Sequence, residues 1–478
     1  MNKSIDFLLI SLLAFALIFS TEIIDINAEN SPYSKETFES GKLPTLLDND
    51  FKIEKFVDGL HVPTTIEFLG EDLLVLQKND GKVRLIHDGI LQAESVLDVE
   101  VSNYGERGLL GITSKDSIVY LFFTEAYHDG GLALENRIYA YTWNGEKLVE
   151  PRLVKTLPGW ATAYNGGVLA TDLDKNVYAT TGNQHKFGIL QNFLVHESSY
   201  CVTDGICDNN QNTFLDNMSS IFSCINVSFH QYTTNPFSHQ RQQPDLSENP
   251  LETNPAFILG NMESCFKAFV HNSFSNGNWK DTSVILKIEP NDDYVAIGIR
   301  NSFGITVDPL TGNLWMTENG PDKYDEINLV LEKSNLGWAK YLGPVNEEDV
   351  AVLPGYEEYI YKNPEFSWEL PVGVTALEFA DSAMFKKYKN WLFVADTNNG
   401  NIYKFRLNSD RDGFVFNESH LQDNILNITD DPKNSLVESM DEILFGKNFG
   451  LISDLEFGPD GSLYVVSLLD GIIYKISS

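Results

Sequence analysis

The sequence has few basic residues for its length. Its 478 residues include 34 Lys and Arg against 68 Asp and Glu, which gives a formal net charge of −34. Phosphate binding needs clustered Lys and Arg, so this balance argues against nucleic acid as a partner. A small neutral or cationic ligand, or one bound with the help of a metal ion, remains compatible with such a chain.

Long hydrophobic runs are also scarce. One apolar run, Phe7–Phe19, follows Lys3, and it is short for a membrane span. Ile26-Asn27-Ala28 resembles a signal-peptidase site, so residues 1–28 are predicted to be a signal peptide, with an uncleaved N-terminal membrane anchor as the alternative. Either reading places the protein outside the cytoplasm, secreted or anchored to the outer face of the membrane. Residues 29–50 are polar and are expected to form a loose lead-in.

Cysteine is rare and confined to one stretch. The four residues, all within about 65 positions, are Cys201, Cys207, Cys224 and Cys265. The sequence contains no CxxC pair, and an exported chain favours two disulfides in one of three connectivities, with metal ligation as the alternative. Four Asn-X-Ser/Thr sequons, typical of a glycoprotein, begin at Asn217, Asn226, Asn417 and Asn427.

Several signatures of common enzymes are missing. The nine histidines show no HxH or HExxH spacing, and neither a GxSxG elbow nor a P-loop is present. Amphipathic helical stretches are nearly absent as well. The chain therefore reads as all-β, without the motifs of a zinc protease, an α/β-hydrolase or a P-loop nucleotide-binding protein.

One pattern recurs about six times: an apolar pair, a polar turn and a β-rich strand. The copies begin at Ile66, Gly111, Leu169, Ile305, Leu377 and Leu455. A self-similar unit of this size predicts a six-bladed β-propeller over residues 51–478, whereas a tandem of β-sandwiches would not usually repeat one hairpin. Phe51–Phe56 is expected to pair with the last blade and close the ring. A long insertion, about residues 185–280, carries all four cysteines between the third and fourth repeats and is expected to form a flap.

The densest polar constellation flanks the repeat unit Ile305–Glu318. Arg300 and Asn301 stand before it, and Glu318-Asn-Gly-Pro-Asp322 with Asp325 and Glu326 stands after it. The acidic side offers carbonyl and carboxylate oxygens suited to a hard cation such as Ca²⁺, or is simply a solvated loop. Arg300 suits a carboxylated or carbonyl ligand, or an ion pair with a neighbouring acid.

The order of these motifs resembles the glucose/sorbosone dehydrogenase family, which includes PQQ-dependent soluble sugar dehydrogenases. The similarity spans about Phe56–Ser478 outside the insertion. The segments that carry it are Gly59–Pro63, Gly105–Gly111, Tyr164–Gly167 with Thr181-Gly182, Arg300–Trp338, Asp396–Gly400 and Gly458–Gly461. Six ordered matches are far more specific than any one of them.

The resemblance implies a six-bladed propeller that binds PQQ and Ca²⁺ over its central channel and oxidises the C1 hydroxyl of an aldose. Gly320 and Pro321 would offer carbonyls to Ca²⁺, with Asp325 beside them. Arg300 and Asn301 would contact PQQ or substrate, and Glu106 would occupy a polar active-site position. Candidate partners of the PQQ carboxylates are Lys404 and Arg406.

Two positions depart from the family pattern. Tyr164 stands where members carry the catalytic histidine, and Asn183 stands where they carry the aspartate that orients it. A free tyrosine has a pKa near 10, against about 6.5 for histidine, so it is a poor proton acceptor at neutral pH. Loss of general-base help costs on the order of 10²–10⁴ in rate. A phenolate at Tyr164, or His185 acting instead, would restore a base.

The sequence thus predicts an exported quinoprotein sugar dehydrogenase-like protein that uses a sugar, PQQ, Ca²⁺ and an electron acceptor. The alternative is a non-catalytic propeller that binds a sugar, an ion or a protein partner, because a fold alone does not determine function.

Overall fold

The computed structural model describes residues 43–159, 161–184, 281–346, 358–427 and 438–478. The chain divides into Met1–Lys42 and Leu43–Ser478, and every described residue belongs to the second unit. The predicted signal peptide, the four cysteines, His185 and the insertion lie outside the described residues. Within the described ranges, no helix has the length and apolar character needed to cross a membrane.

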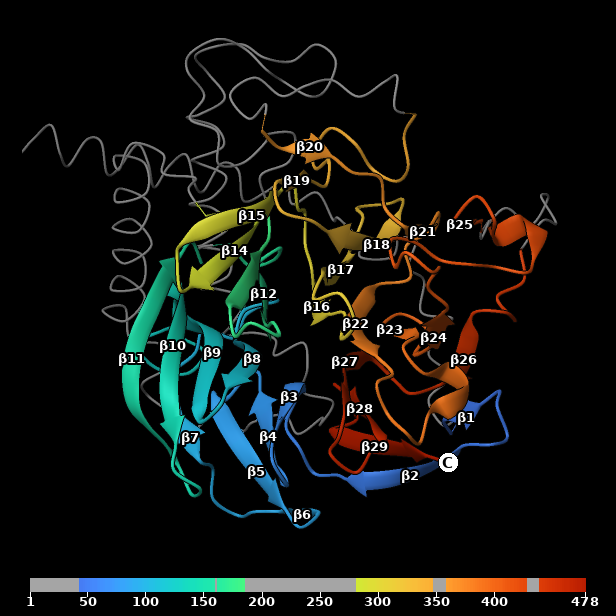
Figure 1. Cartoon of the computed structure of the whole chain (residues 1–478). Coiled ribbons are helices and arrows are strands. Elements are labelled where there is room, and N and C mark those ends of the chain that lie inside the picture. Colours follow the sequence, from blue (N-terminus) through green and yellow to red (C-terminus); the bar gives the residue numbers. More distant parts are fainter. Residues whose placement is uncertain (1–42, 160, 185–280, 347–357, 428–437) are drawn as a thin grey trace, which may run out of the picture. The chain divides into compact units, whose positions relative to one another are not determined.

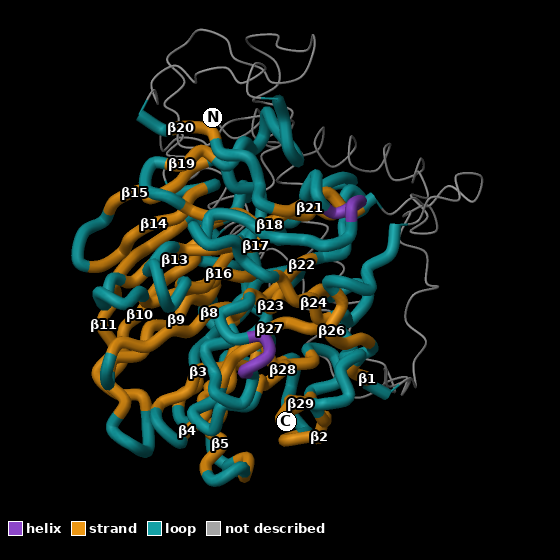
Figure 2. Tube along the Cα trace, turned by 45° about the vertical axis from the view of Figure 1, so that its right-hand side comes forward, coloured by secondary structure: helices purple, strands orange, loops and turns teal. Residues whose placement is uncertain are grey.

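The described chain is almost entirely β-structure, and its strands form six hydrogen-bonded sheets (Figures 1 and 2). The first sheet contains β3 (Pro63–Leu69), β4 (Asp72–Gln77), β5 (Lys82–His87), β6 (Ile90–Leu91) and β7 (Leu97–Asp98). The second contains β8 (Leu109–Lys115), β9 (Ile118–Glu125), β10 (Glu135–Trp143) and β11 (Leu148–Leu157).

The next two sheets also include short added strands. The third contains β12 (Gly166–Thr171), β13 (Val177–Thr181), β14 (Val284–Glu289), β15 (Asp293–Ile297), β19 (Ser334–Asn335) and β20 (Ile360–Tyr361). The fourth contains β16 (Gly304–Val307), β17 (Leu314–Glu318), β18 (Asp325–Val330), β21 (Phe366–Trp368) and β25 (Ile425–Leu426).

The last two sheets combine strands from both ends of the described chain. The fifth contains β22 (Val374–Phe379), β23 (Leu392–Asp396), β24 (Ile402–Phe405), β26 (Leu444–Lys447) and β1 (Thr45–Leu46). The sixth contains β27 (Ile452–Phe457), β28 (Leu463–Ser467), β29 (Ile472–Ser477) and β2 (Lys52–Val57). Two short 3₁₀ helices, η3 (Lys386–Tyr388) and η4 (Ser419–Leu421), complete the described secondary structure.

The first strand of each sheet faces a common axis. Neighbouring first strands contact one another in the order β3, β8, β12, β16, β22 and β27, and β27 contacts β3 to close the ring. This arrangement confirms the predicted all-β propeller. The predicted closure is also confirmed, because β2 pairs antiparallel with β29, with Lys52 opposite Ser477 and Ile53 opposite Ile476.

One sequence expectation gains detail and another needs correction. Residues 185–280 lie between the third and fourth repeats of the sequence, and the strands that flank them, β13 and β14, are neighbours in the third sheet. A hairpin connection tolerates such an insertion because the cost of closing a loop grows slowly with its length. The lead-in over residues 29–50 is not loose throughout, because Thr45–Leu46 pairs with Lys447 and Gly446 at the edge of the fifth sheet.

The polar turn within Ile305–Glu318 shows why the repeat unit folds as a hairpin. The Asp308 carbonyl accepts a hydrogen bond from the Gly312 amide at 2.8 Å, and Gly312 has a φ of +77°, which glycine adopts without strain. The Asp308 carboxylate accepts from the Leu310 amide at 2.9 Å. These local contacts return the chain so that β17 pairs with β16, with Gly304 opposite Thr317.

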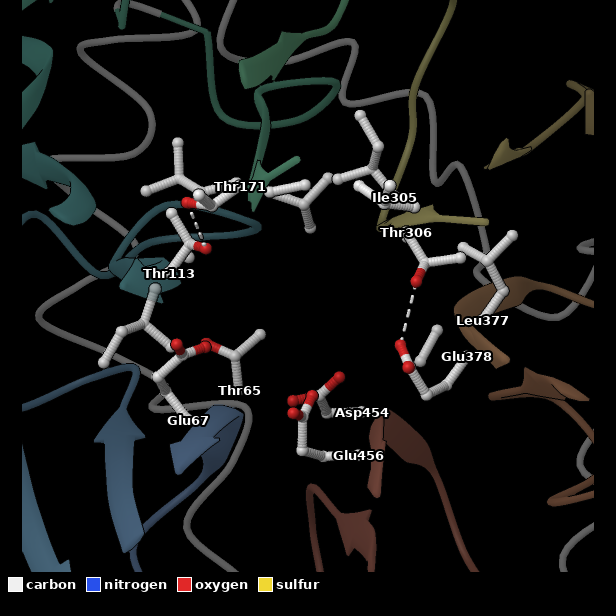
Figure 3. A pocket seen from close by; sticks show the side chains of 18 of the residues that line it. Thr65, Glu67, Thr113, Thr171, Ile305, Thr306, Leu377, Glu378, Asp454 and Glu456 are labelled. Atoms are coloured by element: carbon white, nitrogen blue, oxygen red, sulfur yellow. Dashed lines mark hydrogen bonds between the residues drawn. The ribbon is translucent and has the colours of Figure 1, made fainter. Parts of the chain in front are cut away.

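A cavity of about 390 Å³ runs along the axis and is lined by the first strands of all six sheets (Figure 3). Its walls carry the carboxylates of Glu67, Glu378, Asp454 and Glu456. Glu378 accepts a hydrogen bond from Thr306 Oγ1 at 2.9 Å, and Asp454 accepts from the Ile66 amide at 2.8 Å. Burial raises the pKa of Glu67 and of Glu378 to about 7 and raises that of Asp454 and Glu456 well above its usual range.

We expect removal of the Phe51 ring, which joins β2 to the fifth sheet, to destabilise the protein. Its ring centroid lies 4.5 Å from that of Phe385 and 5.6 Å from that of Phe445. Phe51→Ala should therefore lower the free energy of unfolding by about 3 kcal/mol in equilibrium denaturation. Tyr127→Ala is the control, since that side chain is 83% exposed and its loss should change the same quantity by less than about 0.5 kcal/mol. Equal effects from the two variants would contradict the role of Phe51 in ring closure.

The axial carboxylates predict that stability falls as the pH rises. A raised pKa means that the folded state holds the proton more tightly than the unfolded chain does, so stability from Glu67 and Glu378 is fully present below pH 4.5 and is lost as the pH approaches about 7. The fall in melting temperature from pH 5 to pH 8 should be smaller in Glu67→Gln/Glu378→Gln than in the native protein. The control is Glu94→Gln, at an exposed position. An unchanged pH slope in the double variant would refute the assignment.

Candidate active site

The candidate site lies before the inner strands rather than along them. Glu106 precedes β8, Tyr164 precedes β12, and Arg300 with Asn301 precedes β16. Asn319 and Gly320 follow β17, which returns beside β16 and brings them back to the same end. None of these residues lines the axial cavity of Figure 3, so the site and that cavity occupy different positions on the ring.

Glu106 connects loops that belong to three sheets. Its Oε2 atom accepts a hydrogen bond from the Tyr164 amide at 2.5 Å and one from Asn301 Nδ2 at 3.2 Å. Burial raises the pKa of Glu106, while these hydrogen bonds and the charge of Arg300 act in the opposite direction. The sequence prediction that groups Glu106, Tyr164, Arg300 and Asn301 therefore describes residues that do come together, although no contact here tests their catalytic roles.

The Arg300 side chain is buried, with 5% of its surface exposed. Its Nη1 atom donates to the carbonyl oxygens of Asn319 at 2.7 Å and Gly320 at 3.1 Å. The guanidinium carbon lies 4.3 Å from the centroid of the Tyr164 ring and 5.6 Å from that of Trp338, distances typical of cation–π contacts. The buried Nε atom has no hydrogen-bond partner, so this donor is unsatisfied.

The backbone of Arg300 is also held by hydrogen bonds. The Arg300 amide donates to Glu318 Oε1 at 2.5 Å, and the Arg300 carbonyl accepts from the Asn183 amide at 2.8 Å. Burial raises the pKa of Glu318 well above its usual range, and the nearby charge of Glu326 raises it further. Arg300 therefore has a fixed position between β13 and β17.

Tyr164 holds a backbone conformation that is uncommon for its residue type. Its φ is +60°, and its carbonyl accepts a hydrogen bond from the Gln184 amide at 3.1 Å. A Cβ atom on Gly182 would lie 2.2 Å from the Tyr164 carbonyl oxygen and 3.0 Å from that of Arg300. Only glycine fits there, so the Gly182-Asn183 pair packs against both segments and Asn183 lies next to the predicted catalytic position.

Asp325, which the sequence places beside the predicted Ca²⁺ site, binds main-chain amides through both carboxylate oxygens. Its Oδ1 atom accepts from the Gly320 amide at 2.9 Å, and its Oδ2 atom accepts from the amides of Gly373 at 2.6 Å and Val374 at 3.1 Å. Burial raises its pKa to about 6. The carboxylate therefore anchors the Gly320-Pro321 loop to β22 and uses both oxygens to do so.

The carbonyl oxygen of Gly320, which the sequence predicts to bind Ca²⁺, lies next to a positive charge. The Gly320 oxygen already accepts from Arg300. A Ca²⁺ ion about 2.5 Å from this oxygen would lie within roughly 6 Å of Nη1, and the repulsion would cost on the order of 5 kcal/mol at an effective dielectric constant of about 20. Over the described ranges, no three His, Cys, Asp or Glu side chains are close enough to hold a metal ion.

Lys404 and Arg406 do not join the cluster of Glu106, Tyr164, Arg300 and Asn301. Lys404 lies on β24, the third strand from the axis, and its Nζ atom donates to the carbonyls of Glu442 at 2.9 Å and Leu444 at 2.8 Å. Arg406 follows the same strand and is exposed. A strand motif alone does not reveal how far from the axis a strand lies, and Lys404 lies on the central strand of its five-stranded sheet, two strands from the axis.

Sequence reasoning missed an amide network beneath Tyr164. Gln184 Nε2 donates to Asn165 Oδ1 at 3.0 Å, and Gln184 Oε1 accepts from the Ala161 amide at 3.2 Å. Asn136 Nδ2 also donates to Asn165 Oδ1, at 3.1 Å. Gln184 directly follows the Gly182-Asn183 pair, and Asn165 directly follows Tyr164. Their positions next to these motifs are the feature of the sequence that could have indicated the network.

Sequence comparisons show which known proteins this chain resembles. The family model described as glucose/sorbosone dehydrogenase matches residues 60–198 and 279–475. The aldose sugar dehydrogenase of Escherichia coli is 26% identical over 174 residues, and the match covers 36% of this chain and 40% of that enzyme. A Synechocystis protein of uncharacterised function is 22% identical over 452 residues, which cover 92% of this chain and 89% of that protein.

Solved structures share the fold. The apo form of the E. coli soluble aldose sugar dehydrogenase has a TM-score of 0.55 at 18% identity and matches 89% of this chain and 99% of its own. The PQQ-bound aldose sugar dehydrogenase of Streptomyces coelicolor has a TM-score of 0.52 at 17% identity and matches 91% of this chain and 98% of its own. The family match covers well over half of the sequence, and the chain therefore belongs to the glucose/sorbosone dehydrogenase family.

Proposed function

We propose that this protein is an exported, six-bladed propeller, one blade to each sheet, that binds PQQ over the Arg300 cluster and acts on an aldose. The observation that carries the proposal is the convergence of Glu106, Tyr164, Arg300 and Asn301 from three sheets. These residues come from the segments that carry the family resemblance. The export signal, the disulfides and the glycans belong to the proposal on sequence grounds alone, as does an external electron acceptor.

The residues present suit a planar, carbonyl-rich cofactor. The free Nε–H of Arg300 is a buried donor that an acceptor oxygen would satisfy, and an unpaired buried donor is costly if left alone. Tyr164 and Trp338 add aromatic surface beside the guanidinium. PQQ, when bound, supplies a quinone that accepts the hydride from C1 of the sugar. The predicted Ca²⁺ is assigned no step, because the contacts of Gly320 and Asp325 do not accommodate it.

Proton removal is the weak point of the chemistry. Oxidation of the C1 hydroxyl of an aldose to a lactone releases one hydride and one proton, and the proton needs an acceptor. Asn183 is neutral and cannot stabilise a developing cation beside it. Tyr164 packs its ring against the positive charge of Arg300. Because the residues at these two positions are Tyr164 and Asn183, no imidazole–carboxylate pair is present there. Slow turnover, or binding without turnover, follows from this arrangement.

A second candidate is a non-catalytic propeller that binds a sugar or another ligand at the same face. The simultaneous replacement at Tyr164 and Asn183 favours it, because both members of the proton-transfer pair have lost their titratable imidazole or carboxylate. The two candidates share the binding site and differ only in whether oxidised product accumulates.

We expect Tyr164→His/Asn183→Asp to increase aldose-dependent dye reduction in the presence of PQQ by on the order of 10²-fold over the native protein. Histidine tolerates the positive φ at position 164 better than most residues do, so the backbone should persist. PQQ uptake is followed by absorbance and turnover by the rate of dye reduction. The exposed change Tyr127→His is the control and should leave both quantities unchanged.

The outcomes separate the two candidates. Uptake of PQQ without turnover in the native protein, together with gain of turnover in the double variant, supports a binding site that has lost its base. No uptake by the native protein or the double variant would rule out PQQ as the ligand. Uptake with no gain in the double variant would show that position 164 is not where the proton leaves.

A further inference from the structure

The loop that the family pattern assigns to a divalent cation already holds a positive charge in this chain. Arg300 Nη1 donates to two successive carbonyl oxygens, those of Asn319 and Gly320. Main-chain carbonyls are ligands that Ca²⁺ prefers, and a guanidinium N–H satisfies them equally well as a hydrogen-bond donor. The positive charge at these carbonyls is therefore that of the Arg300 side chain rather than that of an ion bound from solution.

The guanidinium is held in place from several directions. Glu318 accepts from the Arg300 amide, and the Tyr164 and Trp338 rings pack against the charged group. Asp325 fixes the opposite side of the contact, because its Oδ1 atom accepts from the Gly320 amide and its Oδ2 atom binds the start of β22. The side chain and the carbonyls that it contacts are therefore both anchored by buried groups.

Two carboxyl groups lie close to the buried guanidinium. Glu318 accepts a hydrogen bond from the Arg300 amide, and Glu106 accepts one from the amide of Tyr164, whose ring packs against the guanidinium. Asp325, the carboxylate bonded to the Gly320 amide, directs both of its oxygens to main-chain amides. A divalent cation at the Gly320 carbonyl would be repelled by the guanidinium, which disfavours its entry.

We infer that Arg300 takes the place of the divalent cation in this chain, so that Gly320-Pro321 binds no Ca²⁺ and an anionic, carbonyl-bearing ligand meets the guanidinium directly. The Nε–H of Arg300 is the donor still available for that ligand. The statement about the ligand rests on the proposed function, whereas the statement about Ca²⁺ does not.

The first experiment measures Ca²⁺ alone. The full chain, stripped with a chelator, is titrated with Ca²⁺ by calorimetry, and the stoichiometry is compared among the native protein, Arg300→Gln and Arg406→Gln. The matched control removes the same charge from an exposed position. Arg300→Gln frees the two carbonyls and should take up one more equivalent of Ca²⁺ than the other two proteins. Equal stoichiometry in all three would overturn the inference.

A second variant, Arg300→Lys, tests the inference if Arg300→Gln does not fold. Arg300→Lys keeps the charge and presents an ammonium to the same carbonyls, so it should gain no Ca²⁺ site. Circular dichroism verifies that each variant is folded. If only Arg300→Lys folds, a gain of one Ca²⁺ equivalent in it would refute the role of the positive charge, and unchanged stoichiometry would support it.

The third measurement uses PQQ as the probe. The dissociation constant of the native protein for PQQ should agree within about twofold between chelator and millimolar Ca²⁺, and Arg300→Gln should bind at least about tenfold more weakly in chelator. PQQ binding that requires Ca²⁺ would overturn the inference and leave the proposed function standing. No PQQ binding under either condition would refute the proposed function, and the Ca²⁺ stoichiometry would then decide the inference alone.

Discussion

Closure of the ring is the constraint on which the rest of the structure depends. The pairing of β2 with β29 joins the two ends of the described chain in one sheet, and the first strands then meet around a single axis. Once the ring is closed, the loops that precede β8, β12 and β16 open at the same end. Residues separated by nearly two hundred positions, such as Glu106 and Asn301, are thereby placed 3.2 Å apart. The position of the site is therefore determined by the topology of the ring rather than by any one side chain.

Much of this arrangement could be predicted, and for a physical reason. Hairpin chemistry is local, so the turn at Asp308–Gly312 and the strands on either side of it are encoded within a few residues. The motifs that precede the inner strands were identified in order along the chain, and a propeller converts that order into proximity. The grouping of Glu106, Tyr164, Arg300 and Asn301 follows from these two facts.

The contacts of some predicted site residues could not be inferred from the sequence, for an equally specific reason. Lys404 lies in a strand pattern like any other, and its distance from the axis depends on how the whole sheet is stacked. Asp325 looked like a cation ligand because carboxylates near a Gly-Pro loop suit Ca²⁺, but its oxygens are used by the amides of three residues, one of them 49 positions away. Hydrogen-bond competition of this kind depends on long-range contacts, which a motif does not contain. The network of Gln184, Asn165 and Asn136 escaped prediction for the same reason.

The backbone around Tyr164 suggests how a family site changes its chemistry without losing its shape. The left-handed conformation at this residue is imposed by main-chain contacts, namely the bond from its amide to Glu106 and the bond from the Gln184 amide to its carbonyl. Gly182 is required by the same close packing. None of these contacts uses the side chain at position 164 or position 183. The scaffold therefore tolerates different side chains at positions 164 and 183, and the buried charge of Arg300 is held by the Asn319 and Gly320 carbonyls and by the rings of Tyr164 and Trp338. Under the proposed function, a site with the Arg300 guanidinium and this backbone but without an imidazole–carboxylate pair keeps the means to bind a ligand, whereas its means to oxidise that ligand are weakened.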